Sequence, residues 1–449
     1  MTQLTEVARE IFQQALEDCN IQSALARKLS VQNGKLRLMD DSGTWQEWLD
    51  FSVLRHLRII AVGKAASSML TALLNELPWP PDCDLSGVLI APEPPNPLTT
   101  GVQYFRGGHP LPNQASFAGA QAALALLRSL PPEELSQSLC IFLLSGGASA
   151  MMELPLEASI GVDETAAFHS ALIGSGASIG EMNCVRKHFS AVKGGRLGLA
   201  AGNCRCLSLF ISDVPSGQLD VIGSGPTIPD SSTVTQCREI LARYRLPDRF
   251  PASIRDFFAS DSLPETPREV GPDAQFRVLL EASDLTEAAA RRARALGWHT
   301  VVDNTCDEWD YKAAAYYLLK TIRNLRKQFP RVCLISGGEL AVRLPANPAE
   351  GRIGLGGRNQ QFALFAATIL EPADGPVAIL SAGSDGIDGN SPAAGAVIDE
   401  TILAPQDHPS ACRVLADHDS YTFLSERGLT IHTGPTGHNL RDLRILLVR

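Results

Sequence analysis

The sequence predicts an α/β fold made of two α/β domains, with a mainly parallel sheet in the N-terminal one. Three observations carry this prediction. Short apolar strands alternate with helical segments in the first half of the chain, a second such series follows a proline-rich break, and each series contains a strand that runs into Ser-Gly-Gly. Alternating strands and helices are typical of a parallel sheet with helices on both faces.

The predicted elements of the N-terminal half end in polar turns. Residues 4–29 have helical periodicity, and an alanine-rich helix is expected at about 114–129. Apolar strands are expected at 57–62, 87–91, 140–145 and 206–212. Ligands of such sheets bind beyond the carboxyl ends of the strands, so the turns that follow them are the candidate site.

A run of prolines between 245 and 275 interrupts this pattern and marks the predicted domain boundary. One domain is expected over 1–245 and the other over 246–449. The second series of strands is predicted at 277–281, 298–302, 332–336 and 377–381.

The composition indicates an ordinary folded globular protein, with 45% hydrophobic and 20% charged residues. A net charge of -10 argues against a general nucleic-acid binder. The N-terminus lacks the features of a signal or transit peptide, and no apolar run reaches the roughly 18 residues of a membrane helix. Ten scattered cysteines without Cys-x-x-Cys favour a reducing cytosol. We therefore expect a cytoplasmic protein with a small-molecule substrate and no nucleic-acid or membrane partner, and a homo-oligomer stays an open possibility.

The two Ser-Gly-Gly turns are the first candidate site. A glycine pair at the carboxyl end of a strand lets backbone N–H groups approach an anion closely, which is how such turns cradle phosphate. The alternative is that the glycines only permit close packing of a helix on a strand. The predicted phosphate-binding residues are Ser145, Gly146, Gly147 and Ser149 in the first half and Ser336, Gly337 and Gly338 in the second.

Two basic residues are candidates for direct catalysis. Lys64 follows a buried strand, so its amine is expected at the ligand-bearing edge of the sheet, although a surface lysine is the simpler alternative. Arg358 follows the glycine turn 354–357, and its planar guanidinium suits phosphate or carboxylate. An arginine in a mobile loop is the alternative there.

A basic segment at 183–196 is the third candidate. It carries Arg186, Lys187 and Lys193 and no acid, and it ends in Gly194 and Gly195. A solvated helix face is the usual explanation of such a run. The glycine pair after it instead favours anion binding, with Lys193, Gly194 and Gly195 on phosphate.

Three aspartates are candidate metal ligands. Asp213 follows a predicted strand of the first half, and Asp385 and Asp388 follow one of the second half among glycines. Magnesium takes one or two carboxylates together with substrate phosphates, whereas an EF-hand calcium loop needs a longer series of ligands. Turn formation alone is the alternative for each of them.

Other catalytic motifs do not hold. The sequence Gly176-Ala-Ser178-Ile-Gly180 fits a hydrolase elbow, but no strand precedes it, and Ser178 with Glu181 fits a helix capping box. A P-loop, a Gly-x-Gly-x-x-Gly dinucleotide fingerprint and a His-Glu-x-x-His zinc motif do not occur in the sequence.

Ten motifs in order along the chain resemble the glycerate 2-kinase family, the two-domain glycerate kinases of which some are labelled hydroxypyruvate reductase. The motifs are Val62-Gly-Lys-Ala-Ala66, His109-Pro-Leu-Pro112, Leu144-Ser-Gly-Gly-Ala-Ser149, Met182-Asn-Cys-Val-Arg-Lys187, Val192-Lys-Gly-Gly195, Ile211-Ser-Asp-Val214, Gly223-Ser-Gly-Pro-Thr227, Gly356-Gly-Arg-Asn-Gln360, Gly383-Ser-Asp-Gly-Ile-Asp-Gly389 and Thr433-Gly-Pro-Thr-Gly437. They span nearly the whole chain.

The resemblance implies transfer of phosphate from ATP, with Mg²⁺, to the 2-hydroxyl of D-glycerate. It implies a Rossmann-like N-terminal domain, a different C-terminal α/β domain with its core at about 330–447, and an active site in the cleft between them. Lys64 and Arg358 fall on the family's catalytic positions. Asp213 is expected to orient magnesium or to accept the hydroxyl proton, with Asp385 as the weaker candidate. Asn183, Arg186 and Lys187 are expected on substrate.

One departure from the family pattern concerns the turn after Asp213. Family members often continue with an acidic turn, whereas Pro215-Ser-Gly-Gln218 carries no acid here. The resemblance therefore leaves Asp213 as the nearby acid. Two alternatives to the kinase stay open: a reductase of hydroxypyruvate or tartronate semialdehyde, disfavoured by the missing fingerprint, and a nucleotide-binding protein without turnover.

Overall fold

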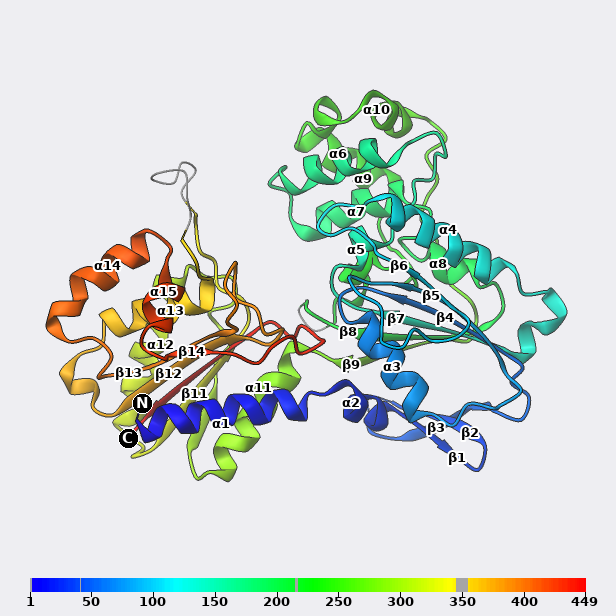
Figure 1. Ribbon diagram of the computed structural model, residues 1–449. Helices are drawn as coiled ribbons and strands as arrows, with labels where there is room; N and C mark the ends of the chain where they lie inside the picture. The colour runs from blue at the N-terminus through cyan, green and yellow to red at the C-terminus, as the bar shows by residue number, and fades with distance from the viewer. Residues whose placement is uncertain (1, 41, 215–216, 345–353) are drawn as a thin grey trace. The chain divides into compact units, whose positions relative to one another are not determined.

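The computed structural model describes residues 2–40, 42–214, 217–344 and 354–449. The chain divides into two compact units (Figure 1). The parallel-sheet unit comprises Ile21–Leu280, and the mixed-sheet unit comprises Met1–Asn20 together with Glu281–Arg449. No helix within the described ranges is long and apolar enough to span a membrane.

The parallel-sheet unit is built on a six-stranded sheet in the order β6-β5-β4-β7-β8-β9, in which every neighbouring pair is parallel. The prediction of a parallel sheet is confirmed. Its strands are β4 (His56–Val62), β5 (Asp84–Ile90), β6 (Val102–Phe105), β7 (Ser138–Leu144), β8 (Arg205–Ile211) and β9 (Ala274–Leu280). A small antiparallel sheet, which the sequence analysis did not predict, contains β1 (Leu29–Gln32), β2 (Lys35–Met39) and β3 (Trp45–Asp50).

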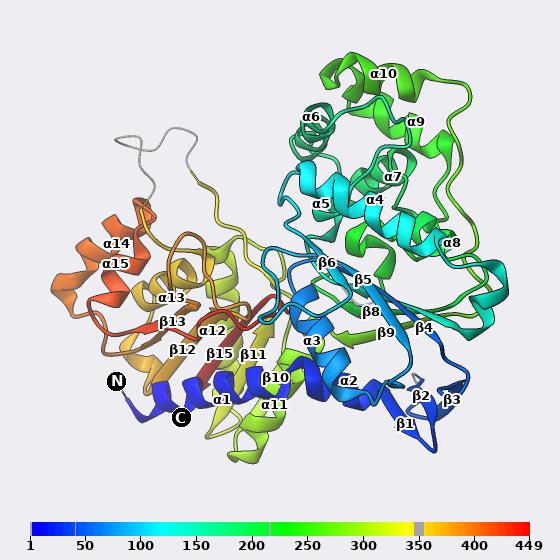
Figure 2. The same cartoon turned by 45° about the vertical axis from the view of Figure 1, so that its right-hand side comes forward.

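Helices cover this sheet and form a separate group beyond it, as Figure 2 shows for α6, α7, α9 and α10. That group has its own core, in which the rings of Phe168, Phe189 and Phe258 pack together. The helices of the unit are α2 (Ile21–Lys28), α3 (Ala66–Glu76), α4 (Gln114–Arg128), α5 (Ala148–Met151), α6 (Val162–Ile173), α7 (Ile179–Phe189), α8 (Arg196–Ala200), α9 (Val234–Arg243) and α10 (Ala252–Ala259).

The mixed-sheet unit has strand order β10-β11-β15-β12-β13-β14, in which only β10 and β11 are parallel neighbours among the described strands. The strands are β10 (His299–Val302), β11 (Val332–Gly337), β12 (Val377–Gly383), β13 (Gly395–Asp399), β14 (Thr430–Ile431) and β15 (Asp442–Val448). The helices are α1 (Gln3–Asp18), α11 (Ala282–Ala295), α12 (Tyr311–Arg326), α13 (Arg358–Thr368), α14 (His408–Ala416) and α15 (Ser420–Ser425).

The division of the chain differs from the predicted boundary at 245/246 in two places. The parallel-sheet unit continues to Leu280, because β9 pairs with β8 and because Phe258 of α10 lies in the core formed by α6 and α7. The N-terminal helix α1 belongs to the mixed-sheet unit, since it packs along α11 and against β12 and β15. Both ends of the chain therefore lie on the mixed-sheet unit (Figures 1 and 2).

Candidate functional site

Three neighbouring strands of the parallel sheet place the predicted residues at one edge. Lys64 follows the end of β4, Ser145 follows β7, and Asp213 lies two residues beyond β8. The order β4-β7-β8 and the parallel pairing put these three carboxyl ends side by side. The structure thus brings Lys64, the first Ser-Gly-Gly turn and Asp213 together at the edge where ligands of parallel sheets bind.

The turns after β4 and β7 are joined by hydrogen bonds. The N–H of Lys64 donates to the carbonyl of Gly146 at 2.9 Å, and the N–H of Ala65 donates to Oγ of Ser145 at 3.0 Å. Ser145 is buried, so its hydroxyl holds the two turns together from inside the protein. Lys64 is exposed, and among the residues that the structure describes none pairs with its ammonium group.

Two backbone N–H groups of the first Ser-Gly-Gly turn have no partner among the described residues. Within the described part of the chain no group accepts a hydrogen bond from the N–H of Gly146 or Gly147. Gly147 has a φ of +83°, which favours glycine, and a Cβ there would lie 3.1 Å from Cδ2 of His109 and 3.4 Å from Cγ of Lys64. The carboxylate of Asp213 packs against Gly146. The glycine pair therefore has two amide donors without a described partner, with the side chains of Lys64, Asp213 and His109 packed against it.

His109 at this point was given no role by the sequence analysis. Partial burial and the nearby Lys64 ammonium lower the pKa of its imidazole below the usual range. The only signal in the sequence was its place in one of the ten motifs. The residues Pro215 and Ser216, which begin the departure from the family pattern, lie outside the described residues.

Asn183, Arg186 and Ser224 form a buried polar cluster, and the half-buried Ser149 borders it. Oγ of Ser224 donates to Oδ1 of Asn183 at 2.9 Å and lies 2.9 Å from Oγ of Ser149. Nη1 of Arg186 donates to the same Oδ1 at 3.3 Å, and burial lowers the pKa of this arginine. Ser224 has a φ of 61°, unusual for a serine, and it was missed by the sequence analysis although glycines flank it.

The two lysines of the basic segment bind carboxylates of the protein. Nζ of Lys187 lies 2.9 Å from Asp220 and 3.1 Å from Asp230. Nζ of Lys193, fully buried, lies 2.5 Å from Oε2 of Glu153, an acid that the sequence analysis did not single out. In the structure both lysines thus neutralise acids, which differs from the predicted contacts with substrate and phosphate.

Gly194 and Gly195 also use their N–H groups internally. These donate to the carbonyls of Ser224 and Gly225 at 3.0 and 2.7 Å. The glycine pair therefore joins the start of α8 to the Ser224 loop and differs in use from the predicted phosphate contact. The alternative of a solvated helix face does not describe the segment either, since Arg186, Lys187 and Lys193 are buried.

Glu153 is the centre of a buried ionic cluster. Its Oε2 also lies 2.8 Å from Nε2 of His169 in α6. Burial alone would raise the pKa of Glu153, but the Lys193 ammonium and the His169 ring together lower it to about 2. Burial lowers the pKa of His169 to about 4 despite the carboxylate. The imidazole is therefore neutral near pH 7.

The second Ser-Gly-Gly turn, in the mixed-sheet unit, differs from the first because side chains occupy it. The N–H of Gly337 donates to Oδ1 of Asn304 at 2.7 Å, and the N–H of Glu339 donates to Oδ1 of Asp307 at 3.0 Å. A Cβ on Gly338 would lie 2.5 Å from the same Asp307 oxygen. Where phosphate was predicted, the turn thus holds a carboxylate of its own chain.

Two arginines support that carboxylate and the turn. Nη1 of Arg441 donates to Oδ2 of Asp307 at 2.6 Å. Arg444, which is fully buried in β15, donates through Nη2 to the carbonyls of Gly337 and Gly338 at 2.6 and 3.1 Å. Oγ of Ser336 is buried without a hydrogen-bond partner in the described chain.

Arg358 begins α13 and is held between carboxylates. Its Nε donates to Oδ2 of Asp442 at 2.6 Å, and its Nη2 lies 2.8 Å from Oε1 of Glu339. Burial opposes the charge, yet the Asp442 carboxylate raises the pKa of Arg358 above its usual value. About a third of the side chain, 34%, is exposed, so the guanidinium is both fixed and accessible.

Of the three predicted metal ligands, Asp388 has another use. Oδ1 accepts the N–H of Asn359 at 3.1 Å and Oδ2 accepts the N–H of Gln360 at 2.9 Å, so Asp388 caps the start of α13. Oδ1 of Asp385 accepts the N–H of Ile387. Across the described residues no three His, Cys, Asp or Glu side chains gather as a metal site.

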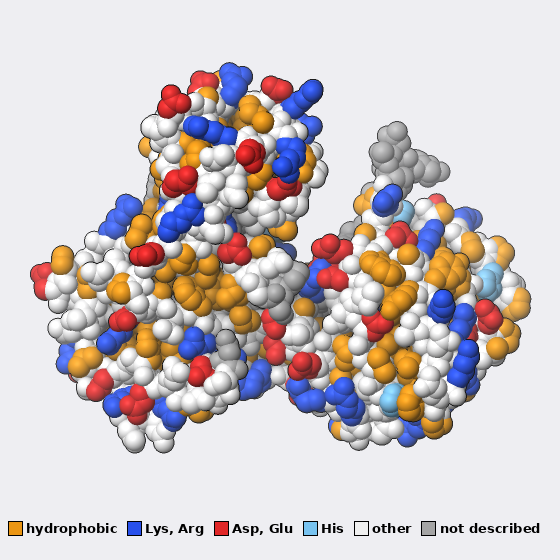
Figure 3. Space-filling model, turned by 180° about the vertical axis from the view of Figure 1, so that it is seen from behind, with side chains coloured by type: hydrophobic (Ala, Val, Ile, Leu, Met, Phe, Trp, Pro, Cys, Tyr) orange, Lys and Arg blue, Asp and Glu red, His pale blue; other side chains and the backbone are white. Residues whose placement is uncertain are grey.

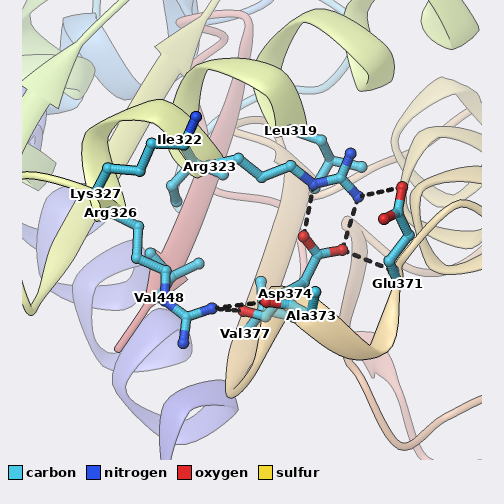
Figure 4. A pocket seen from close by; sticks show the side chains of 10 residues that line it. All are labelled: Leu319, Ile322, Arg323, Arg326, Lys327, Glu371, Ala373, Asp374, Val377 and Val448. Carbon is cyan, nitrogen blue, oxygen red and sulfur yellow. Dashed lines mark hydrogen bonds and ion pairs between the residues drawn. The ribbon is translucent and has the colours of Figure 1, made fainter.

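A pocket of about 410 Å³ in the mixed-sheet unit contains none of the predicted residues (Figure 4). It lies at the start of β12 and the end of β15, whereas Arg358 and Asp442 lie at the opposite ends of these strands. Arg323 binds both oxygens of Asp374 there, at 2.6 and 2.7 Å. This ion pair joins α12 to the segment before β12.

Two families match the sequence. The family described as "Domain of unknown function (DUF4147)" matches residues 7–259, and the MOFRL family matches residues 332–442. The first match covers more than half of the chain. Together they contain every residue of the predicted sites.

Several relatives match over most of their length. The D-glycerate 2-kinase of Thermotoga maritima is 34% identical over 77% of this chain and 80% of its own. A putative hydroxypyruvate reductase of Agrobacterium vitis is 35% identical over 87% of this chain and 98% of its own. The crystal structure of a glycerate kinase from Thermotoga maritima superposes with a TM-score of 0.81 at 30% identity and covers 99% of both chains.

Proposed function

Because the chain belongs to the glycerate 2-kinase family, we propose that it transfers a phosphoryl group from ATP to the 2-hydroxyl of D-glycerate and releases 2-phosphoglycerate and ADP. One observation carries this proposal. The side chain of Lys64, whose ammonium is unpaired by any described residue, lies with its Cγ against the first Ser-Gly-Gly turn, and the Gly146 and Gly147 N–H groups of that turn have no described acceptor. A lysine next to backbone amides that have no acceptor of their own suits a transferring phosphoryl group.

Each part of this edge receives a role in the proposal. The N–H groups of Gly146 and Gly147 hold a nucleotide phosphate, and Lys64 offsets the charge that develops during transfer. Arg186, fixed by Asn183, receives the carboxylate of glycerate. Arg358 acts as a second cation on phosphate, which its partial exposure and its fixed guanidinium support.

Magnesium belongs to the proposal together with ATP. Asp213, partly exposed and packed against Gly146, would hold the ion, and Asp385 is the weaker candidate because it lies in the mixed-sheet unit. The absence of a three-residue cluster in the described chain fits an ion that takes one or two carboxylates and otherwise phosphates and water. When bound, magnesium neutralises phosphate charge.

A cytoplasmic location is part of the proposal as well. All ten cysteines are thiols outside disulfide bonds, and eight of them are buried. Free cysteines are typical of proteins kept in a reducing compartment. On the face shown in Figure 3, acidic and basic side chains are interspersed over the described residues, which favours a small-molecule substrate over nucleic acid.

A second candidate activity is a reductase, because one relative carries the name putative hydroxypyruvate reductase. The missing dinucleotide fingerprint weighs against it. The deciding experiment is an assay of ATP-dependent turnover of D-glycerate with magnesium, coupled through enolase so that only 2-phosphoglycerate gives a signal. An assay of NADH with hydroxypyruvate runs beside it. Signal in the first supports the kinase, and oxidation of NADH with silence in the first would replace it by the reductase.

The role of Lys64 is tested by Lys64→Ala. We expect kcat to fall about 10²- to 10³-fold with the fold intact, because a fixed charge on the transition state is worth that much. Lys35→Ala is the matched control, since Lys35 is a partly exposed lysine of the same unit that pairs with Glu47. It should leave kcat unchanged. Near-normal turnover of Lys64→Ala would remove Lys64 from the mechanism.

A further inference from the structure

His109 is an exposed imidazole at the proposed phosphoryl site. A Cβ on Gly147 would lie 3.1 Å from its Cδ2 and 3.4 Å from Cγ of Lys64, so the ring and the lysine side chain flank the same glycine. Among the residues that the structure describes none forms a hydrogen bond with either ring nitrogen. Both nitrogens are therefore available to a ligand bound on the turn.

The groups around His109 leave one task unfilled. Transfer of a phosphoryl group to a hydroxyl requires that the hydroxyl proton go to an acceptor. The ammonium of Lys64 and the backbone N–H groups of Gly146 and Gly147 are donors only. The carboxylate of Asp213 lies against Gly146, on the neighbouring glycine, where the proposal assigns it to magnesium.

The local electrostatics keep the His109 ring able to accept a proton. Partial burial and the Lys64 ammonium both favour the neutral imidazole, as the lowered pKa of the ring shows. A neutral imidazole beside a bound phosphate accepts a proton from a hydroxyl without first losing its own. Neutrality also avoids the repulsion that a carboxylate would exert on phosphate.

We infer that His109 is a further catalytic residue of the proposed reaction, which rests on the proposed function, and that it is the general base for the 2-hydroxyl. The hydroxyl oxygen forms a bond to the γ-phosphorus while its proton passes to a ring nitrogen of His109. The bond from that phosphorus to the bridging oxygen breaks, and its electron pair leaves with ADP. The imidazolium then releases the proton to solvent.

The experiment is His109→Ala in the full chain, assayed with ATP, magnesium and D-glycerate through enolase. A general base is worth about 10²- to 10⁴-fold, so we expect kcat to fall at least about 10²-fold while the KM for glycerate changes little. Added imidazole should restore part of the turnover, since the exposed site leaves room for it. His109→Gln keeps a hydrogen-bonding side chain without a proton acceptor of suitable pKa and should stay as slow as His109→Ala.

The matched control is His56→Ala. His56 begins β4, at the other end of the strand that Lys64 follows, and it pairs with Glu134 at 3.2 Å. Its removal should leave kcat near the wild-type value, and imidazole should have no effect on it. Melting temperatures near that of the wild type would show that both variants fold.

The outcomes separate this inference from the function on which it rests. No ATP-dependent signal from the wild-type chain would overturn the kinase itself. An active wild type with His109→Ala at more than about a third of its kcat would overturn only the role of His109. The base would also be excluded if imidazole failed to restore turnover, or if His109→Gln were as fast as the wild type.

Discussion

The two Ser-Gly-Gly turns carry the same sequence but differ in what fills them. In the parallel-sheet unit, no described group accepts from the N–H of Gly146 or Gly147. In the mixed-sheet unit, Asn304 and Asp307 accept from the turn, and the Asp307 carboxylate lies against Gly338. A glycine pair after a strand thus creates a place for an anion, and its surroundings decide whether that anion is a ligand or the protein's own carboxylate.

The supports of the two turns differ in the same way. The helix α5 that leaves the first turn is followed by Glu153, which Lys193 and His169 neutralise within the buried cluster. Under the second turn lies Arg444, whose guanidinium binds two carbonyls and no carboxylate within ion-pair distance in the described chain. A buried cation favours anions nearby, and the carboxylates of Asp442 and, more weakly, Asp307 act on it.

The largest expected effect comes from Gly147→Ala. A Cβ at a φ of +83° strains the turn and meets His109 at 3.1 Å, so the amide that the proposal assigns to phosphate is displaced. Loss of one such donor costs about 10²- to 10³-fold in rate. We expect kcat/KM for ATP to fall by about that factor in the enolase-coupled assay.

The control for this change is Gly338→Ala in the other turn. Its φ of +95° is equally unfavourable for alanine, and the added Cβ meets Asp307. We expect a lower melting temperature with kcat/KM for ATP within a few-fold of the wild type, a small factor beside that of a lost donor. If Gly338→Ala instead lowered kcat/KM for ATP as much as Gly147→Ala, the contrast between the turns would be wrong.

Acid should lower the stability of the buried Glu153 cluster beside the first turn and should affect the surroundings of the second turn much less. His169 has a pKa of about 4 in the folded chain, below the usual 6.5, so the unfolded chain takes up the proton first and stability falls as pH drops below 6.5. Between about pH 7 and about pH 5 this amounts to roughly 2 kcal/mol. Hydrogen exchange of α6 should become about 30-fold faster relative to its intrinsic rate, and α12 should change much less.

The variant His169→Gln sharpens this test. Glutamine can still donate to Glu153 but does not titrate, so the pH dependence of α6 exchange between about pH 7 and about pH 5 should largely disappear. Glu153, with a pKa of about 2, adds a further loss in both proteins only as pH falls through about 4.5. An unchanged pH dependence in His169→Gln would place the sensitivity elsewhere.

The fold was predictable wherever local pattern decides the element. Alternating apolar strands and helices sufficed for five of the six parallel strands, although β9 was placed in the second series. The short strand β6 was not predicted. The strand β15 was missed, and it pairs between β11 and β12, far from both in sequence. The amphipathic face of α1 fits any apolar surface, so its sequence could not tell which unit it would cover.

The site residues that directly follow a strand were predictable, because the end of the strand determines where they lie. Lys64 and the first Ser-Gly-Gly turn follow adjacent parallel strands, and the structure brings them together. The direction of Lys193 could not be predicted, because it depends on Glu153, which lies 40 residues away. The filling of the second turn depends likewise on Asp307, which lies in a loop before α12.

The smallest expected effect, and the sharpest test of what fills a turn, comes from Asp307→Asn. The amide oxygen of asparagine can still accept from Glu339, but the charge that offsets Arg441 and Arg444 is gone. We expect a loss of about 1 kcal/mol in stability, since the Asp307 side chain is partly exposed. Because the negative charge of Asp307 is absent from the turn, inorganic phosphate should bind there and raise the melting temperature of the variant more than that of the wild type.

Asp310→Asn is the matched control for phosphate. Asp310 caps α12 by accepting from the N–H of Lys312 at 3.0 Å, three residues beyond Asp307, and it does not bond to the turn. Its substitution should leave the response to phosphate at the wild-type level. If Asp307→Asn responded no more than Asp310→Asn, the second turn would lack affinity for an anion even without its own carboxylate. The glycine pair would then serve packing alone in the mixed-sheet unit, and the two turns would differ in kind as well as in what fills them.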